Sequence, residues 1–411
     1  MITIKKTSKR PGVFRGYQKF GEMYNNSNPL MQNVIFHHPK RLVFGTNSLK
    51  QMADDYLTLG LRRFFMVTVP SIMEQLSPVI DFLKSKGIAI QIHLSSKGEP
   101  TFADFEQLLS EAKSFNADSV AGIGGGSVMD VAKLVAAQLH NNQSIKSIVG
   151  NGLLKERATY LICMPTTSGT GSEVSPNAIL MDPKDKAKRG IISPYLVPDG
   201  AYIDPTLTLG LPQSVTAYTG IDALTHCIEA YANKFSHPMV DVLALEGIGL
   251  ISRNLKKVVD NGQDLDARSK VALGSVYGGM CLGPVNTAAV HALAYPLGSE
   301  FKIAHGIANA LLLPHVMEFN LPAAEKRYAD IAIAMGANKA ATDHETALNG
   351  ICLIRKLLND CYVPTHLSTI GVPLKDIHQL ATLAMEVKRL LNNNVREITL
   401  EDAENIYNTA Y

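Results

Sequence analysis

Short apolar segments alternate with amphipathic segments in the first half of the chain. Residues 62–69 and 88–94 are short and strongly apolar, which predicts two buried β-strands. Between them, over residues 71–86, apolar positions recur at three- and four-residue spacing, as in a helix with one buried face. Strands that are joined through helices form parallel sheets, so this half of the chain predicts an α/β domain with a mostly parallel sheet.

The pattern changes near residue 205. Before it, strand-like segments at 119–123 and 160–164 continue the alternation. After it the strand-like segments stop, and helical periodicity is found at 215–233, 237–260, 265–282, 307–318, 323–335, 344–359 and 374–391. We therefore expect an N-terminal extension over residues 1–30, an α/β domain over 31–205 and an all-α domain over 206–411.

Composition excludes several classes of protein. With 46% apolar and 18% charged residues, the chain is not disordered or collagenous. A formal charge of +2 is too small for an extended nucleic-acid surface, so no nucleic-acid partner is expected. Five cysteines without a CxxC pair form a poor disulfide framework, which favours a reducing compartment such as the cytoplasm.

Two segments raise the question of targeting. Residues 1–20 contain six Lys or Arg and no acidic residue, but they lack the apolar core of a secretory signal. A flexible basic extension is favoured over a transit peptide. Residues 271–299 contain no Asp, Glu, Lys or Arg, yet several glycines and prolines interrupt them, so we expect a buried helix pair and no membrane span.

A glycine-rich turn follows the predicted strand at 119–123. Its sequence, from Gly122 to Asp130, is GIGGGSVMD, and such a turn between a strand and a helix lets backbone N–H groups face a phosphate. It is not the GxGxxG fingerprint, because Ser127 stands in place of the last glycine. Ser127 and Asp130 would also fit a simple helix-capping pair, and the residues alone leave both interpretations open.

A second polar loop follows the strand at 160–164. Its sequence, from Pro165 to Glu173, is PTTSGTGSE, which gathers hydroxyl groups and small residues where open α/β sheets bind ligands. A solvated connection would have a similar composition. Two such loops in one domain favour a cofactor site.

Asp222 and His226 have the spacing of metal ligands, because residues four apart lie on one face of a helix. A capping Asp beside a core His would look the same. His291 and His305 are further candidates, but on one continuous helix they would lie about 21 Å apart. We expect a chain break around Pro296, Gly298 and Gly306 to bring them together. One carboxylate and three imidazoles suit Fe(II) or Zn(II).

Four motifs in this order, GIGGGSVMD, PTTSGTGSEV, GIDALTHCIEAY and VHALAYPLG with the following HG and ANALLLPHV, resemble the iron-containing (group III) alcohol dehydrogenases. The resemblance extends from about Phe36 to the C-terminus. It implies a nucleotide-binding α/β domain, a helical metal-binding domain and an active site in the cleft between them. It also implies a small-molecule substrate and a homo-oligomer, at least a dimer.

The resemblance implies a role for each candidate residue. A metal, Fe(II) with Zn(II) as the alternative, would be held by Asp222, His226, His291 and His305. NAD or NADP would be bound by Gly125, Gly126, Ser127, Asp130, Thr166, Thr167, Thr170, Asn177 and Lys188.

Two positions depart from the family pattern. Val69 stands where many members have an Asp that accepts from the adenosine ribose, so the choice between NAD and NADP is open. Tyr295 stands where many members have a His near the nicotinamide. We take the Tyr as a branch marker and a candidate proton relay, with simple packing as the alternative.

We therefore expect a metal-dependent, NAD(P)-linked oxidoreductase that interconverts a primary alcohol or hydroxyacid and its aldehyde or ketone. One alternative is a dehydroquinate-synthase-like or glycerol-dehydrogenase-like enzyme of the same superfamily, the former requiring more Lys and Arg near the site. The other is a non-catalytic subunit that binds metal or cofactor.

Overall fold

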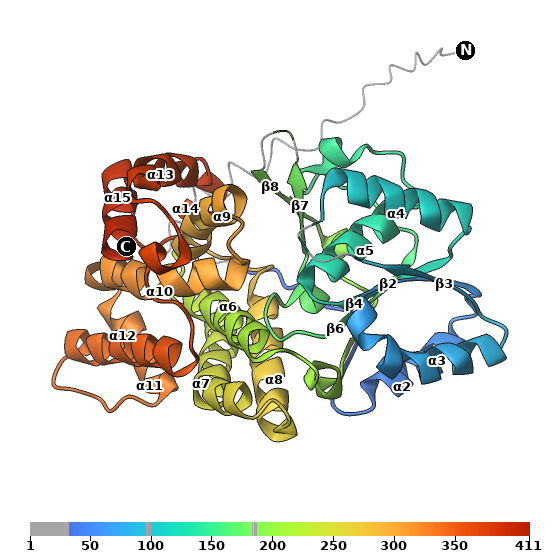
Figure 1. Cartoon of the computed structure of the whole chain (residues 1–411), viewed down its shortest axis with the longest axis horizontal. Helices are drawn as coiled ribbons and strands as arrows, with labels where there is room; N and C mark the ends of the chain where they lie inside the picture. Colours follow the sequence, from blue (N-terminus) through green and yellow to red (C-terminus); the bar gives the residue numbers. More distant parts are fainter. Residues whose placement is uncertain (1–32, 96–97, 99, 183, 185–186) are drawn as a thin grey trace, which may run out of the picture.

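Two bodies lie side by side in the computed structural model, which describes residues 33–411 apart from 96–97, 99, 183 and 185–186. The first is an α/β body, and the second consists of helices, as Figure 1 shows from blue to green and from yellow to red. The N-terminal extension predicted for residues 1–30 lies outside the described residues.

The main sheet contains six strands within the described part of the chain, and every neighbouring pair is parallel. In spatial order they are β1 (Arg41–Phe44), β9 (Gly200–Ile203), β6 (Tyr160–Pro165), β4 (Ser119–Gly124), β2 (Arg63–Thr68) and β3 (Ala89–Leu94). The prediction of a mostly parallel α/β domain is confirmed. The short edge strand β1 and its short neighbour β9 were not predicted.

Both faces of this sheet are covered by helices. Successive side chains of a strand point to opposite faces, and apolar side chains on both faces need to be buried. Phe64 and Met66 of β2 pack in the cluster with α2 (Ser48–Thr58) and α3 (Met73–Ser85). Phe65 and Val67 point to the other side, where they join α4 (Phe102–Ser114) and α5 (Gly126–Gln138). Figure 1 shows the two helix pairs on opposite sides of the strands.

The sheet contains a topological switch point between β2 and β4. The chain leaves β2 for β3 on one side, and it leaves β4 for β6 on the other. Ligands of open α/β sheets bind outside the carboxyl ends of strands at such a point. The predicted glycine turn follows β4 at this edge, and Val69 directly follows β2 there.

A smaller sheet lies between the main sheet and the helices, with the order β5 (Gly150–Asn151), β8 (Ala187–Ile192) and β7 (Asn177–Asp182). β7 and β8 pair in antiparallel fashion. They carry Asn177 and Lys188, and Figure 1 shows both strands beside the helical body.

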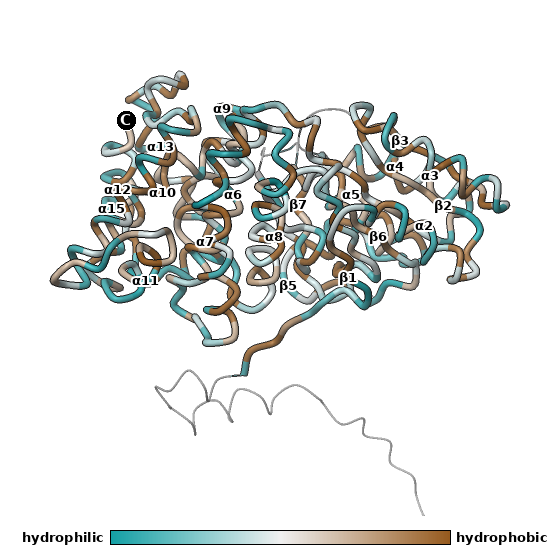
Figure 2. Tube along the Cα trace, turned by 90° about the horizontal axis from the view of Figure 1, so that it is seen from below, coloured by the Kyte–Doolittle hydropathy of each residue, from teal (hydrophilic) through white to brown (hydrophobic). Residues whose placement is uncertain are grey.

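The helical body contains ten α-helices among the described residues: α6 (Gln213–Tyr231), α7 (Pro238–Asp260), α8 (Leu265–Cys281), α9 (Ala289–Phe301), α10 (His305–Asn320), α11 (Glu325–Met335), α12 (Asp343–Asp360), α13 (Ile377–Met385), α14 (Lys388–Leu391) and α15 (Leu400–Thr409). They enclose one large apolar core. Figure 2 shows the apolar segments concentrated along α6 and α7, inside the body. We propose residue 205 as the boundary between the two parts, since the last strand ends at Ile203 and α6 begins at Gln213.

The prediction of a single helix over 374–391 is wrong. The segment is divided into a short 3-10 turn, α13 and α14, with a break at Val387, where φ is −82° and ψ is 45°. The break has a packing reason. α13 lies against α15 and α9, and after the break α14 also contacts α9 and has its Leu390 side chain fully buried.

The break predicted around Pro296, Gly298 and Gly306 is found between Gly298 and Gly306 and not at the proline. Pro296 lies inside α9, and the helix continues to Phe301. The chain reverses one residue later, at Lys302, whose φ is 55°. α10 then begins at His305, two residues before the predicted start.

The two bodies touch through bare backbone at one point. A Cβ atom on Gly171, in the loop after β6, would lie 2.3 Å from the Cα atom of Gly279 in α8. A Cβ atom on Gly279 would likewise lie 2.6 Å from the Cα atom of Gly171. Neither position has room for a side chain. In the described residues no helix is long and apolar enough to cross a bilayer.

Candidate active site

Helix α6 carries the first two candidate metal ligands. Asp222 and His226 are one turn apart, and both side chains are buried. The Asp222 Oδ1 atom lies 3.9 Å from His226 Nε2, which is too long for a hydrogen bond. The two candidate metal-ligating atoms therefore face each other without a hydrogen bond between them.

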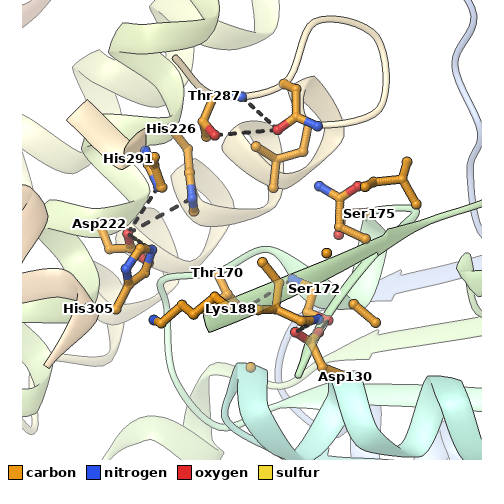
Figure 3. Close-up of a pocket in the computed structure, with 18 of the residues that line it drawn as sticks. Asp130, Thr170, Ser172, Ser175, Lys188, Asp222, His226, Thr287, His291 and His305 are labelled. Atoms are coloured by element: carbon orange, nitrogen blue, oxygen red, sulfur yellow. Dashed lines mark hydrogen bonds and ion pairs between the residues drawn. The ribbon is translucent and has the colours of Figure 1, made fainter. Parts of the chain in front are cut away.

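His291 and His305 complete the cluster from two other helices. His291 lies in the first turn of α9, and His305 is the first residue of α10. Their Nε2 atoms lie 3.6 Å and 3.7 Å from Asp222 Oδ1. Figure 3 shows the three histidines turned toward Asp222. The structure thus brings together all four predicted ligands, with Asp222, His226 and His291 forming the tightest group.

A second layer of polar side chains holds this cluster. Glu229, one turn beyond His226 on α6, is buried, and its Oε2 atom lies 2.5 Å from His291 Nδ1. Its Oε1 atom accepts the backbone N–H of Val290 at 2.6 Å. The fully buried Asn309 donates its amide to Asp222 Oδ1 at 2.7 Å. Glu229 thereby leaves Nε2 of His291 facing the cluster.

The electrostatics favour the protonation states that a metal requires at Asp222, His226 and His305, but they favour a protonated His291. Burial alone would raise the pKa of Asp222, but the neighbouring histidines, His226 and His305 first, hold it far below its usual value. Burial lowers the pKa of His226 and of His305, and Lys188 lowers that of His305 further. These two imidazoles are therefore neutral. For His291, burial opposes protonation, but Glu229 and Asp222 outweigh it and raise its pKa to about 9.

The donor set fits a divalent ion. A tetrahedral ion bound at about 2.1 Å would separate its donors by roughly 3.4 Å, close to the observed distances from Asp222 Oδ1. The buried Nδ1 atoms of His226 and His305 and Oδ1 of Asn309 have no hydrogen-bond partner among the described residues. One oxygen and three nitrogen donors suit Fe(II) or Zn(II).

The glycine turn lies opposite this cluster. Gly125 is the N-cap of α5, and the helix begins at Gly126, so Ser127 lies inside the helix. The alternative prediction of a Ser127–Asp130 capping pair is therefore wrong. A Cβ on Gly126 would lie 2.5 Å from the Thr170 side chain, which requires glycine there. A Cβ on Gly125 would make only ordinary contacts, so the chain itself does not exclude a side chain at that position.

Two side chains of α5 fix the second loop in place. Asp130 accepts hydrogen bonds from Ser172 Oγ at 2.5 Å and from the backbone N–H of Ile179 at 2.9 Å. The fully buried Lys133 donates to the carbonyl oxygens of Ser175 and Asn177, each at 2.9 Å. α5 thereby fixes the position of the segment from Ser172 to Ile179.

One cavity of about 150 Å³ is lined by residues from both bodies. From the α/β side it includes six of the nine cofactor candidates, namely Gly126, Ser127, Asp130, Thr170, Asn177 and Lys188. From the helical side it includes the four ligand candidates and Tyr295. Gly125, Thr166 and Thr167 do not line it. The buried Thr166 donates its backbone N–H to Gly124 O at 2.9 Å, which fixes the second loop to the end of β4.

Tyr295 lies one turn after His291 on α9. The centroid of its ring is 5.9 Å from that of His305, and Lys188 Nζ is 5.6 Å from the Tyr295 centroid. Tyr295 therefore connects the ligand cluster with the cofactor side of the cavity. Figure 3 shows Lys188 reaching toward the cluster.

Sequence reasoning missed three polar residues of the site. Glu229 was detectable in principle, because it follows His226 by three residues within an apolar helix and shares its face. Lys133 lies within the apolar stretch of α5 from Val131 to Ala137, an anomaly that indicates a buried partner. Arg389 lines the cavity from α14, more than 80 residues after His305, and nothing local distinguishes it from a surface arginine.

The remaining histidines lie outside the cluster, and one of them is a core residue. His315 in α10 is buried, and its Nδ1 atom has no partner among the described residues. Burial, aided by the positive charge of Arg355, lowers the pKa of His315 to about 4.

A parallel α/β domain whose glycine turn shares a cavity with an Asp–His cluster of a helical domain is the arrangement of a metal-dependent, nucleotide-linked oxidoreductase. The comparisons define the class further. The model of iron-containing alcohol dehydrogenase matches residues 39–205, and the model of the C-terminal region of the Fe-containing alcohol dehydrogenase family matches residues 216–411.

Similar proteins agree with these matches. Long-chain-alcohol dehydrogenase 1 of Geobacillus thermodenitrificans is 35% identical over 89% of this chain and 94% of its own length. The crystal structure of a 1,3-propanediol oxidoreductase has a TM-score of 0.89 at 30% identity, covering 92% of this chain and all of its own. That of a sulfoacetaldehyde reductase from Bifidobacterium kashiwanohense, in complex with NAD+, has a TM-score of 0.83 at 26% identity over 92% and 99%.

The chain belongs to the iron-containing alcohol dehydrogenase family. It is an oxidoreductase that interconverts alcohols and carbonyl compounds.

Proposed function

We propose that the protein is a metal-dependent dehydrogenase in which Asp222, His226, His291 and His305 hold Fe(II) or Zn(II). The observation that carries this proposal is the single cavity lined by these residues and by six cofactor candidates. A group bound on one side would therefore lie next to a group bound on the other. This shared cavity, with a complete donor set, favours an enzyme over a non-catalytic subunit.

The cofactor is NAD or NADP. The turn at Gly125 to Ser127 presents the N-terminus of α5 to the pyrophosphate, where backbone N–H groups and the helix dipole favour negative charge. Lys188 adds a positive charge between this turn and the cluster. A relative solved in complex with NAD+ supports a nicotinamide cofactor, and Val69 leaves the choice between NAD and NADP to measurement.

Each chain residue has a defined task in the reaction. When bound, the ion supplies stabilisation of negative charge on the substrate oxygen, and the nicotinamide supplies the hydride acceptor. Asp222 and the three histidines fix the position of that oxygen, and Glu229 holds His291 in the ligating tautomer. The buried walls of the cavity exclude water and keep the reacting carbon in line with the cofactor. The Tyr295 hydroxyl relays the alcohol proton toward solvent.

The test is a spectrophotometric screen of NADH and NADPH oxidation against short aldehydes and keto acids, with Fe(II) or Zn(II) supplied. We expect turnover that requires one of the two metals and stops in His305→Ala. The content of bound metal in purified His305→Ala is measured alongside. Full metal content in that variant would contradict the ligand assignment, and absence of turnover with both metals would contradict the proposed reaction.

Location and assembly are part of the same proposal. The five cysteines are all free thiols in the structure, which agrees with a reducing cytoplasm. We propose at least a dimer, to be measured by light scattering of the purified full chain.

A further inference from the structure

The cavity between the two bodies is lined by four side chains of fixed charge among the described residues: Asp130, Lys188, Asp222 and Arg389. Three of them are engaged with groups of the site. Asp222 faces the three histidines, Asp130 fixes the second loop, and Lys188 lies beside the Tyr295 ring. Arg389 is different, because no described residue forms a hydrogen bond or an ion pair with its guanidinium.

The guanidinium of Arg389 lies against the backbone of β8. A Cβ atom on Gly190 would lie 3.4 Å from Arg389 Nη2 and 3.9 Å from its Cζ. Gly190 lines the cavity two residues after Lys188, on the same face of the strand. A glycine there leaves room for the planar guanidinium at the cavity wall.

The short helix that carries Arg389 is fixed to the same wall. Its Leu390 side chain is fully buried. Asn393, just beyond the helix, donates its Nδ2 to the carbonyl oxygen of Thr287 at 2.7 Å, and Thr287 lines the cavity. α14 begins directly after the break at Val387. The backbone that carries the arginine is therefore fixed, while the Arg389 side chain is exposed.

We propose that Arg389 binds an anionic oxygen group of the substrate, a carboxylate or a sulfonate, at the end remote from the reacting carbon. The inference rests on the proposed function, since the oxygen of the reacting carbon is placed at the Asp–His cluster. The preferred substrates are then short oxo acids and the matching hydroxy acids. A guanidinium suits this task because its fork donates two parallel hydrogen bonds to one carboxylate.

The cofactor is a poorer match for Arg389. All nine cofactor candidates lie between Gly125 and Lys188 in the α/β body. Arg389 comes from the helical body, which also contributes the Asp–His cluster and Thr287 to the cavity. Its charge therefore serves the part of the cavity where the substrate lies.

The experiment compares 4-oxobutanoate with its methyl ester, which removes the negative charge and keeps the aldehyde. For the wild type we expect the acid to be preferred. In Arg389→Ala, kcat/KM for the acid should fall about ten- to a hundredfold, mainly through KM, because a hydrogen bond to a charged group is lost. The value for the ester should be unchanged.

Two variants control for charge and for geometry. Lys388→Ala removes the neighbouring exposed cation of α14, which does not line the cavity, and should behave as the wild type. Arg389→Lys keeps the charge without the fork and should recover part of the preference. Oxo acids of increasing length and sulfoacetaldehyde then show whether carboxylate or sulfonate is the better anion.

Equal acid-to-ester ratios in the wild type and in Arg389→Ala would overturn the inference. So would a loss of NADH or NADPH affinity in that variant, measured by fluorescence titration, with an unchanged ratio. Absence of turnover with every substrate would instead contradict the proposed function. In that case calorimetric binding of 4-hydroxybutanoate decides the role of Arg389, since weaker binding in Arg389→Ala supports it and equal binding overturns it.

Discussion

Replacing Glu229 by Gln should weaken metal binding although Glu229 is not a ligand. The carboxylate faces two donors, with Oε2 at 2.5 Å from His291 Nδ1 and Oε1 at 2.6 Å from the backbone N–H of Val290. A glutamine offers one acceptor oxygen, so its NH2 group must face one of these N–H donors. The substitution therefore leaves a buried donor unpaired and releases the orientation of His291.

The expected magnitude follows from the position of Glu229 directly behind a ligand. Loss of such a partner lowers metal affinity by about 10- to 100-fold, or roughly 1.4–2.7 kcal/mol. A second signature concerns protons. Glu229 helps to raise the pKa of His291 to about 9 in the metal-free protein, so below that pH metal binding displaces a proton from His291. Glu229→Gln should therefore release fewer protons than the wild type when it binds the metal near neutral pH.

The assay is competition for Zn(II) between the protein and a chromophoric chelator, together with calorimetry in buffers of different ionisation enthalpy. Glu246→Gln, on the exposed side of α7, is the matched control and should bind as the wild type. Glu229→Asp keeps the negative charge on a shorter side chain, and its Zn(II) affinity should lie between those of the wild type and Glu229→Gln. Wild-type affinity and proton release in Glu229→Gln would refute the role assigned to this carboxylate.

Three further predictions concern the cofactor side and the fold. Gly125→Ala should weaken NADH binding at an unchanged melting temperature. Gly126→Ala should also lower the melting temperature, because its Cβ would lie 2.5 Å from the Thr170 side chain. Fluorescence titration measures the first effect and thermal melts measure the second. Val69→Asp should shift kcat/KM toward NAD over NADP by about ten- to a hundredfold, and an unchanged ratio would place Val69 away from the ribose. The wild type should lose up to about 3 kcal/mol of unfolding free energy as the pH falls from 6.5 to 4, because His315 binds a proton in the unfolded chain but stays neutral in the folded one. Urea titrations should show a smaller loss in His315→Asn. The same loss of unfolding free energy in both proteins would contradict the lowered pKa of His315.

The ligand cluster could be predicted in part from local spacing. Asp222 and His226 share a helix, so four-residue spacing suffices to place them on one face. His291 and His305 depend on where α9 ends, and the sequence placed that break only within the span marked by Pro296, Gly298 and Gly306, because proline and glycine often interrupt a helix. In the fold the proline is retained within α9, and Lys302 in the left-handed region makes the reversal.

Other parts of the site are set by distant contacts that no local pattern records. The partner of Glu229 is a backbone N–H at the start of a helix about 60 residues later. Arg389 reaches the cavity because the predicted helix over 374–391 breaks to bury Leu390. The paired strands β1 and β9 are four residues each and about 160 residues apart, too short for periodicity to detect.

The contact between Gly171 and Gly279 has a consequence for how the sequence can vary. When two packed side chains touch, a larger residue on one side is often compensated by a smaller one on the other. Here both partners are already the smallest amino acid, so an enlargement at either position has no compensating change at the other. In a library of single and double variants, both positions should be depleted of every replacement, and pairs should rescue nothing. Sequence change at the Gly171–Gly279 contact between the two bodies is therefore blocked on both sides at once.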